Sequence, residues 1–305
     1  MLGAVDIGGT KIAVGLVTES GQLVDSTFLP TQPDQSYPAA LGDIISALEN
    51  LTQINNATLH GIGIGITGRI LPTDGMIQRN QFLPHWSARY PARDLLDHFG
   101  VTAAIENDAD AVALAEHQWG SCKSAERLIY VTVSTGIGGG TILGGKLYRG
   151  VDGSHPEIGH HVVDPSGPAC FCGAHGCWES MASGTALASW ARENGGNPDW
   201  DARFICDLAE RGNSIALQAI EREARYLGLG LANLMTIFAP DCIVLGGGLM
   251  HRWELFRENA EAVIQRHCNL IPRDKVKLSM SRLQHPGLVG AAATWVHHFG
   301  DSRDI

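Results

Sequence analysis

The chain has 305 residues, which is long enough to bury a sizeable core and to form two lobes. Its apolar fraction of 44% and charged fraction of 18% are typical of a globular protein and exclude a disordered one. The formal net charge of −10 argues against a nucleic-acid partner, because phosphate backbones are bound by clustered Lys and Arg.

The N-terminal part of the sequence predicts strands followed by helices. Short aliphatic runs separated by glycines favour a strand, a Gly-rich turn, a second strand, a turn at Ser20–Gly21 and a third strand. Residues 37–54 carry apolar side chains at helical spacing, which predicts a helix. Residues 60–68 read as a buried strand that runs into a turn. Residues 108–119 are rich in Ala and open with acidic side chains, which favours a helix with a complemented N-terminal dipole.

The segment 128–148 repeats the plan of the N-terminus: an aliphatic strand, a polar Gly-rich turn, a second strand and a turn. Two such units, about 130 residues apart, predict a duplicated α/β protein with two lobes. The remaining elements that we expect are a strand at 242–248 and helices near 183–194, 202–211, 214–238, 251–268 and 288–299.

The sequence does not predict a membrane protein or a secreted one. It has no run of about 18 apolar residues that could form a transmembrane helix. Asp6 interrupts the first apolar run and no basic segment precedes it, so the N-terminus does not read as a signal peptide. Three of the seven cysteines crowd together, which favours a metal site in a reducing compartment over a disulfide framework. We therefore expect a cytoplasmic protein without a membrane partner.

Three Gly-rich turns follow predicted strands: Asp6–Lys11, Ser134–Gly140 and Gly246–Gly248. Glycines let backbone N–H groups approach an anion, Thr10 adds a hydroxyl donor, and an acid at a strand end can hold hydrated Mg²⁺ near phosphates. The first turn lacks the GxxxxGK[ST] spacing of a P-loop. A tight hairpin explains any one of these turns, but three in one chain favour nucleotide binding.

The cysteine cluster reads Cys170-Phe171-Cys172-Gly173-Ala174-His175-Gly176-Cys177. Three thiolates would supply three tetrahedral ligands of a structural Zn²⁺, and a histidine would supply the fourth. The sequence leaves four candidates for that ligand, which are His155, His160, His161 and His175.

Several acidic residues adjoin these features. Asn107-Asp108 follows an apolar segment and places a carboxylate at a strand-to-helix junction. Glu157 precedes His160 by three residues, and Glu179 follows Cys177 by two. Any one of these acids could be a solvated surface group, and it is their association with the Gly-rich turns and the cysteine cluster that favours a functional site.

Together the turn Asp6–Lys11, the turn Ser134–Gly140, the motif Glu157-Ile158-Gly159-His160 and the run CFCGAHGCWESMASG at 170–184 resemble the ROK family. That family contains bacterial sugar kinases and related sugar-responsive repressors. The resemblance covers nearly the whole chain, and EIGH combined with C-x-C-x4-C-x-E is a specific pattern.

The resemblance implies a two-lobed actin-like (ribonuclease H-like) ATPase fold of the α/β class with a zinc knuckle in the second lobe. We expect a small lobe over residues 1–118 and a larger lobe over 119–305, with the closing helix at about 288–299 packed back onto the first lobe. It also implies a homo-oligomer, either a dimer or a tetramer.

The roles of individual residues follow from the same resemblance. Asp108 would be the general base for the 6-hydroxyl of a hexose. Zn²⁺ would be held by His160, Cys170, Cys172 and Cys177. The sugar would be bound by Gly68, Asn80, Asn107, Asp108, Glu157, His160 and Glu179. ATP, with Mg²⁺, would be bound by Asp6, Gly8, Gly9, Thr10, Lys11, Thr135, Gly136, Gly138, Gly247 and Gly248.

Three positions depart from the family pattern. Phe171 replaces a glycine between the first two cysteines, His155-Pro156 stand where small residues precede the Glu, and His285-Pro286-Gly287 replaces an Asp-containing turn. The first change would bulk out the knuckle, and the second would stiffen a sugar-binding loop.

The resemblance leaves the substrate open. We expect glucose, because Trp178 and His155-Pro156 would fill the recess that an acetamide group at the sugar C2 needs. The alternative is that neither faces the sugar and that Trp178 packs beneath the zinc knuckle. N-acetylmannosamine and N-acetylglucosamine are the alternatives, and fructose ranks below them. A repressor is disfavoured because the first Gly-rich turn begins at residue 6, with no room for a preceding helix-turn-helix. An actin-like filament or chaperone ATPase would not need EIGH or the cysteine knuckle.

Overall fold

The computed structural model describes residues 1–32 and 34–300. They form two compact units. Unit 1 comprises Met1–Ser124, Gly140–Pro156 and the chain from Arg282 onward, and unit 2 comprises Ala125–Gly139 and Glu157–Ser281. The two large sheets have five strands each, in the orders β3-β2-β1-β4-β7 and β10-β9-β8-β11-β12. Within the described ranges, no helix is both long and apolar enough to cross a membrane.

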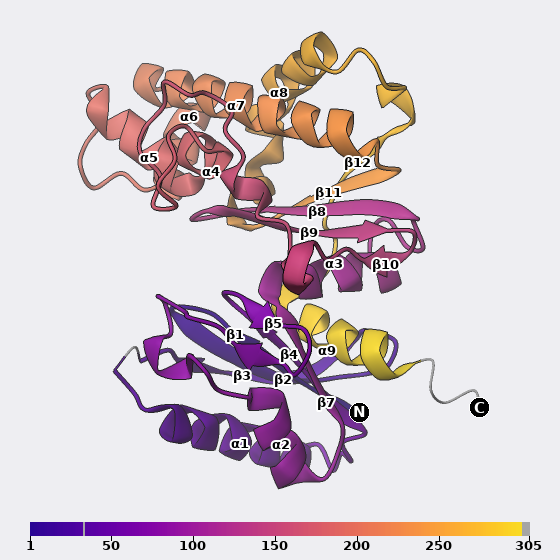
Figure 1. Ribbon diagram of the computed structural model, residues 1–305. Helices are drawn as coiled ribbons and strands as arrows, with labels where there is room; N and C mark the ends of the chain where they lie inside the picture. Colours follow the sequence, from indigo (N-terminus) through magenta and orange to yellow (C-terminus); the bar gives the residue numbers. More distant parts are fainter. Residues whose placement is uncertain (33, 301–305) are drawn as a thin grey trace. The chain divides into compact units, whose positions relative to one another are not determined.

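The sheet of unit 1 mixes two strand directions. β1, β4 and β7 are parallel neighbours, and β2 and β3 are added to β1 as an antiparallel meander. Helices α1 and α2 lie on one face of this sheet and α9 on the other (Figure 1). The bounds are β1 Leu2–Ile7, β2 Lys11–Val17, β3 Leu23–Pro30, α1 Tyr37–Ile54, β4 Gly61–Ile66, α2 Pro91–Phe99, β7 Ala103–Asn107, α3 Asp108–Gln118 and α9 Pro286–Phe299.

The long periodic segments of unit 1 form the elements that the sequence predicts. The predicted helix at 37–54 is α1, the one at 108–119 is α3, and the one at 288–299 is α9. The sequence reasoning missed α2 and the hairpin of β5 (Ile70–Leu71) and β6 (Met76–Ile77), which is followed by the short helix η1 (Pro84–Trp86). Strands of two residues are too short to show a period.

Glycines on β4 decide how closely α9 packs. A Cβ added to Gly63 would lie 1.7 Å from the carbonyl oxygen of Ala291, and one added to Gly61 would lie 1.9 Å from Nε1 of Trp295. The run GIGIGI therefore presents glycines to α9 and isoleucines to the opposite side, where Ile62, Ile64 and Ile66 pack with α1 side chains. Helix α9, near the C-terminal end of the chain, thus packs directly on β4, which belongs to its N-terminal part.

Unit 2 carries a helical layer on one face of the second sheet (Figure 1). The bounds are β8 Arg127–Val133, β9 Ile137–Leu143, η3 Ile158–His160, α4 Trp178–Ala182, α5 Gly184–Glu193, α6 Ala202–Glu210, α7 Ser214–Phe238, β11 Cys242–Gly246, η4 Gly248–Arg252, α8 Trp253–His267, η5 Arg273–Lys275 and β12 Lys277–Met280. The strand β10 (Lys146–Leu147) and the short helix η2 (Val151–Gly153) belong to unit 1. The predicted helices at 183–194, 202–211, 214–238 and 251–268 correspond to α5, α6, α7 and α8, whereas α4 and β12 were not predicted. The predicted α/β class is confirmed for both units.

The core of unit 2 lies between α7 and the sheet. Ile129 and Val131 of β8, together with Ile243 of β11, pack against buried side chains of the helices. α7 is 25 residues long and contains Gly230, where an added Cβ would lie 2.0 Å from the Trp178 ring. The absence of a side chain at Gly230 therefore makes the space in which Trp178 is enclosed.

Candidate active site and metal centre

Asn107 ends β7 and caps α3. Its Oδ1 accepts hydrogen bonds from the backbone N–H groups of Ala109, at 3.0 Å, and Asp110, at 3.4 Å. These are N–H groups of the first helical turn that have no partner within the helix. The Asn107 side chain also donates through Nδ2 to the carbonyl oxygen of Gly68 at 3.1 Å. Asn107 therefore fixes both the start of α3, where Asp108 is the first residue, and the neighbouring turn.

Two carboxylates meet at the carboxyl edge of the parallel strands of unit 1. Asp6 pairs with Gly65 of β4, and Gly65 pairs in turn with Glu106 of β7, next to Asn107 and Asp108. A Cβ added to Gly65 would lie 3.8 Å from Oδ1 of Asp6 and 3.7 Å from Cα of Asp108. Since this edge is where open α/β sheets bind their ligands, a small residue between the two acids leaves room for one.

Burial raises the pKa of both carboxylates, and the charge of Asp108 adds to the effect at Asp6. Burial, and then the negative charge of Asp108, raise the pKa of Asp6 to about 7, against the opposing effect of Lys11. Burial also raises the pKa of Asp108, although the Ala109 N–H, 2.9 Å from its Oδ1, and the His155 ring act in the opposite direction. A divalent cation held beside Asp6 would reverse this effect by favouring the charged carboxylates.

The predicted sugar-binding turn at Gly68 depends on Asn80. Gly68 has φ +99°, which favours glycine, and an added Cβ would lie 2.6 Å from the Asn80 amide nitrogen. Asn80 is 4% exposed. Its Nδ2 donates to the Thr67 carbonyl at 2.7 Å, and its Oδ1 accepts from Phe82 and Leu83 N–H. Asn80 therefore shapes the turn through bonds to the backbone.

The first Gly-rich turn joins β1 to β2 and presents its polar side chains outward. The Gly8 N–H donates to the Lys11 carbonyl at 3.0 Å, and the Thr31 hydroxyl donates to the Gly8 carbonyl at 2.7 Å. Gly8 and Gly9 are half-buried, whereas Thr10 and Lys11 are exposed. At its other side, an added Cβ on Gly287 at the start of α9 would lie 2.0 Å from Oδ2 of Asp6. Gly287, part of the His285-Pro286-Gly287 departure, thus lets the N-terminus of α9 lie close to the Asp6 carboxylate.

In unit 2, Glu179 joins the second Gly-rich turn to the cysteine segment. Its Oε2 accepts from the Ile137 N–H at 2.9 Å, and an added Cβ on Gly136 would lie 2.2 Å from the same oxygen. Thr135 is exposed at the tip, and its carbonyl accepts from the Thr185 hydroxyl at 2.8 Å. The turn is thereby held by α4 and α5, while the side chain of Thr135 remains exposed at the surface of the unit.

The EIGH motif packs onto the same turn. An added Cβ on Gly159 would lie 2.0 Å from the Ile137 carbonyl oxygen, which explains the glycine in the motif. Glu157 is exposed, and its carbonyl accepts from the His160 N–H at 3.0 Å. Glu157, His160 and Glu179 are therefore all carried by segments that border the second turn in unit 2.

The third Gly-rich turn ends β11. Gly247 has φ +90°, and an added Cβ would lie 2.4 Å from the Val133 carbonyl oxygen. Gly248 has no atom within 4 Å of an added Cβ. The first glycine is therefore required by the backbone of unit 2, whereas the second leaves an open surface beside it that a flat ring can approach.

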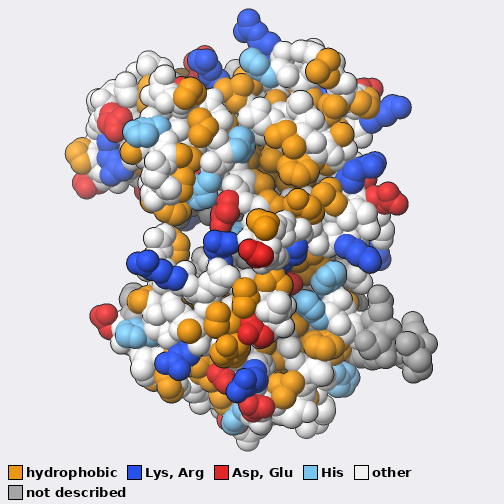
Figure 2. Space-filling view, viewed as in Figure 1, with side chains coloured by type: hydrophobic (Ala, Val, Ile, Leu, Met, Phe, Trp, Pro, Cys, Tyr) orange, Lys and Arg blue, Asp and Glu red, His pale blue; other side chains and the backbone are white. Residues whose placement is uncertain are grey.

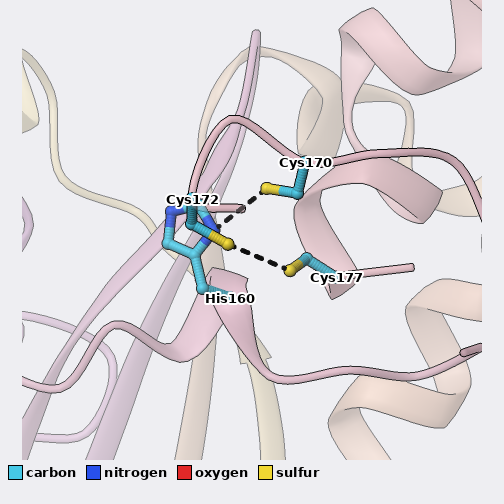
Figure 3. Close-up of side chains that lie close together, drawn as sticks. All are labelled: His160, Cys170, Cys172 and Cys177. Carbon is cyan, nitrogen blue, oxygen red and sulfur yellow. Dashed lines mark hydrogen bonds between the residues drawn. The ribbon is translucent and has the colours of Figure 1, made fainter. Parts of the chain in front are cut away.

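Four side chains of unit 2 converge as the metal motif predicts: His160, Cys170, Cys172 and Cys177, with ligand atoms all within 4.8 Å of one another (Figure 3). Nδ1 of His160 lies 3.4 Å from the Cys170 sulfur, and the sulfurs of Cys172 and Cys177 are 3.5 Å apart. Burial, and then the adjacent thiols, raise the pKa of Cys177 to about 12. Three sulfurs and one imidazole nitrogen are the donor set of a closed tetrahedral Zn²⁺ site, and such a cation would stabilise the thiolates.

The structure decides between the candidate histidines. His161 bonds through Nδ1 to the Ile158 carbonyl at 2.6 Å and its ring lies against Trp178. His155 belongs to unit 1 and lies 3.8 Å from Oδ2 of Asp110. His160 alone of the four candidates belongs to the cysteine group, and the Phe171 ring stands edge-on to it with centroids 4.9 Å apart. Phe171, which stands where the family has a glycine, thus packs against His160, the histidine of the metal group.

Comparison with known proteins identifies the family to which the chain belongs. The sequence model of the ROK family matches residues 2–298. The chain belongs to the ROK family. The match covers both units, so the predicted family and its two-lobed α/β fold with a zinc-type cysteine motif are confirmed.

Similar ROK proteins act on more than one sugar. The chain is 34% identical over 269 residues to a glucokinase of Streptomyces coelicolor, covering 82% of this chain and 83% of that one. It is 38% identical over 247 residues to an N-acetylmannosamine kinase of Escherichia coli, covering 81% and 82%. A crystal structure of a Streptomyces griseus ROK glucokinase with glucose and AMPPNP superimposes with a TM-score of 0.80 at 30% identity, covering 95% of this chain and 97% of that one.

One part of the substrate interpretation is wrong. Trp178 of this ROK protein is fully buried in the core of unit 2, where its Nε1 donates to the Tyr226 carbonyl at 3.0 Å. It therefore cannot fill a recess beside a bound sugar. His155 does line a cavity, of about 220 Å³ within unit 1, together with Arg69 and Asn107. The size of the acetamide recess is thus not decided by Trp178.

The sequence reasoning also missed a group of charged residues around the Asn107-Asp108 junction. Arg149 contacts both Glu106 and Asp110, which are 43 and 39 residues away in the chain. No motif pointed to Arg149, because nothing in its local sequence shows which acids it meets.

Elsewhere, Lys and Arg side chains are dispersed among acidic and neutral ones on the face seen in Figure 2.

Proposed function

We propose that this ROK protein is an ATP-dependent hexose kinase that phosphorylates the 6-hydroxyl, with glucose as its preferred substrate. The observation that carries this proposal is the pair of carboxylates at the ends of β1 and β7, separated by Gly65. One of them, Asp6, adjoins a Gly-rich turn with exposed Thr10 and Lys11. The other, Asp108, begins a helix and is only half-buried. Phosphoryl transfer requires a base beside the place where the phosphate charge is neutralised.

In the proposed reaction the sugar O6 attacks the γ-phosphorus of ATP. The O6–P bond forms while the bond from that phosphorus to the bridging oxygen breaks, and ADP leaves. The O6 proton passes to the carboxylate of Asp108. Burial raises the pKa of Asp108 above its ordinary value, which makes its carboxylate a stronger proton acceptor.

We assign the sugar ring to Gly68, Asn107, Glu157, His160 and Glu179, with Asn80 shaping the Gly68 turn. His160 supports this assignment, because its Nδ1 faces the cysteines and leaves Nε2 for a hydroxyl. The phosphates are assigned to the turns at Gly8–Lys11 and Thr135–Gly138, and the adenosine to Gly247 and Gly248. Mg²⁺ beside Asp6 would neutralise phosphate charge, and Zn²⁺ on His160 and the three cysteines would hold the knuckle in shape.

N-acetylmannosamine is the second candidate substrate. It is favoured by the 38% identity to an N-acetylmannosamine kinase, whereas glucose is favoured by the glucose-bound relative that covers 95% of this chain. A site that hydrogen-bonds a given substituent discriminates strongly against analogues without it.

The test is kcat/KM for glucose, N-acetylmannosamine, N-acetylglucosamine and fructose, measured by ADP release with ATP and Mg²⁺. We expect glucose to give the highest value. If kcat/KM for an acetamido sugar exceeds that for glucose tenfold, the proposed substrate is wrong and the proposed hexose kinase activity is not. ADP release with none of the four sugars would refute the hexose kinase itself.

A further inference from the structure

One arginine of unit 1 holds both sides of the Asn107-Asp108 junction. Nη1 of Arg149 donates to Oδ2 of Asp110 at 2.6 Å, and its Nη2 donates to Oε2 of Glu106. Glu106 is the residue before the Asn107-Asp108 pair, on β7, and Asp110 is the second residue after it, on α3. We call Arg149, Glu106 and Asp110 the Arg149 bridge.

The Arg149 bridge is largely removed from water. The Asp110 side chain is 0% exposed, that of Glu106 13% and that of Arg149 20%. Two histidines add to it: Nε2 of His298 on α9 lies 3.0 Å from Oε1 of Glu106, and Nδ1 of His155 lies 3.8 Å from Oδ2 of Asp110. A buried ion pair contributes little net stability, because desolvation offsets its attraction. What the Arg149 bridge contributes is therefore sought in the geometry that it fixes rather than in net stability.

The role of the Arg149 bridge follows from geometry. Glu106 and Asn107 are successive strand residues and point to opposite faces, so Asn107 restrains the junction from one side while Glu106 restrains it from the other. Asn107 bonds the first N–H groups of α3, and the Arg149 bridge ties the end of β7 to Asp110 in the same helical turn. Rotation of the first turn of α3, which would redirect Asp108, breaks one of these contacts.

We propose that Arg149 is a positioning residue that fixes the direction of the Asp108 carboxylate through Glu106 and Asp110. This proposal rests on the proposed function, because it takes Asp108 as the general base. A guanidinium is required, because its planar fork reaches two separate carboxylates at once, which a lysine ammonium on a flexible stem does not.

The kinetic test compares Arg149→Lys with wild type. We expect kcat for the sugar to fall about 10- to 100-fold, because small misplacements of a reacting group have effects of that order. The sugar KM should change less than about threefold, since the ring contacts are untouched. Methylguanidine should restore part of kcat in Arg149→Ala, saturably, and leave the wild type unaffected. The matched control is Arg127→Lys, whose arginine also pairs with a carboxylate, Asp241, but at the surface.

A second measurement does not need activity. Hydrogen–deuterium exchange of the Ala109–Val112 amides should accelerate in Arg149→Lys, while β8 amides keep their wild-type rates. Glu106→Gln should give the same local effect, which covers the case in which an Arg149 variant does not fold. An Arg149→Lys enzyme with kcat within twofold of wild type, or unchanged exchange at Ala109–Val112, would overturn the proposal. If wild type phosphorylates no hexose, the proposed function fails and exchange alone decides whether the bridge holds the junction.

Discussion

Glu223 is a carboxyl group buried without a hydrogen-bond partner. It lies on α7 with 0% exposure, and both of its oxygens lack a partner among the described residues. Burial, against a smaller opposing effect of Arg222, raises the pKa of Glu223 well above its ordinary value of 4.5. We predict that Glu223→Met stabilises unit 2, because an apolar side chain of similar length removes an unsatisfied buried group, an effect of about 1–3 kcal/mol.

The sign of the pH dependence follows from the raised pKa. The folded state keeps the Glu223 proton at pH values where the unfolded chain has lost it. The contribution of Glu223 to stability is therefore fully present below its unfolded pKa of 4.5, and it is lost as the pH rises through the folded value. The stability gain from Glu223→Met should accordingly grow with pH, by up to about 1.4 kcal/mol for each pH unit.

The assay is thermal unfolding of wild type and Glu223→Met between pH 5 and pH 8. Each kcal/mol should raise Tm by about 2–4 °C. Glu221→Met, on the exposed side of the same helix, is the control and should shift Tm little at any pH. A Glu223→Met gain in Tm that does not change between pH 5 and pH 8 would refute the reasoning.

Further predictions concern the base, the metal, the packing of α9 and assembly. Asp108→Asn should fold with the wild-type Tm and bind sugar but lose at least about 10²-fold in kcat, so a near-wild-type rate would remove its role. Elemental analysis should find about one zinc per chain. Cys172→Ser and Cys177→Ser should each lose the zinc, with a lower Tm and a higher sugar KM. A fully active preparation without metal would contradict the zinc site. Gly63→Ala should lower the free energy of unfolding in urea by about 1–3 kcal/mol or more, because the new methyl group would meet the Ala291 carbonyl oxygen. Gly42→Ala, which lies in open space on α1, is the control and should raise that free energy by about 0.5–1 kcal/mol. Equal effects of the two substitutions would show that α9 does not pack so closely on β4. Light scattering should give a multiple of the 32.6 kDa chain mass, and the monomer mass would exclude the homo-oligomer.

The local patterns of the sequence were sufficient where a single segment carries the whole signal. The apolar spacing of residues 37–54 and 214–238 predicts α1 and α7 at their observed bounds, because a helix of several turns repeats its period often enough to be recognised. The cysteine spacing likewise predicts a metal group, since three ligands lie within eight residues. Strands as short as β5, β6 and β12 give no such repetition and were missed.

By itself, then, the sequence determined the fold class, the long helices, the Gly-rich turns and the identity of the thiol ligands. The resemblance named His160 as the fourth ligand, and the tertiary structure confirms that it lies with the cysteines. Only the tertiary structure decided that Trp178 is enclosed beside Gly230 and that Arg149 meets Glu106 and Asp110. The reason is physical: spacing and residue type act over a few residues of chain. The partner of a side chain across the fold depends instead on how elements distant in sequence pack, and a glycine or a buried acid gives no local sign of what it will meet.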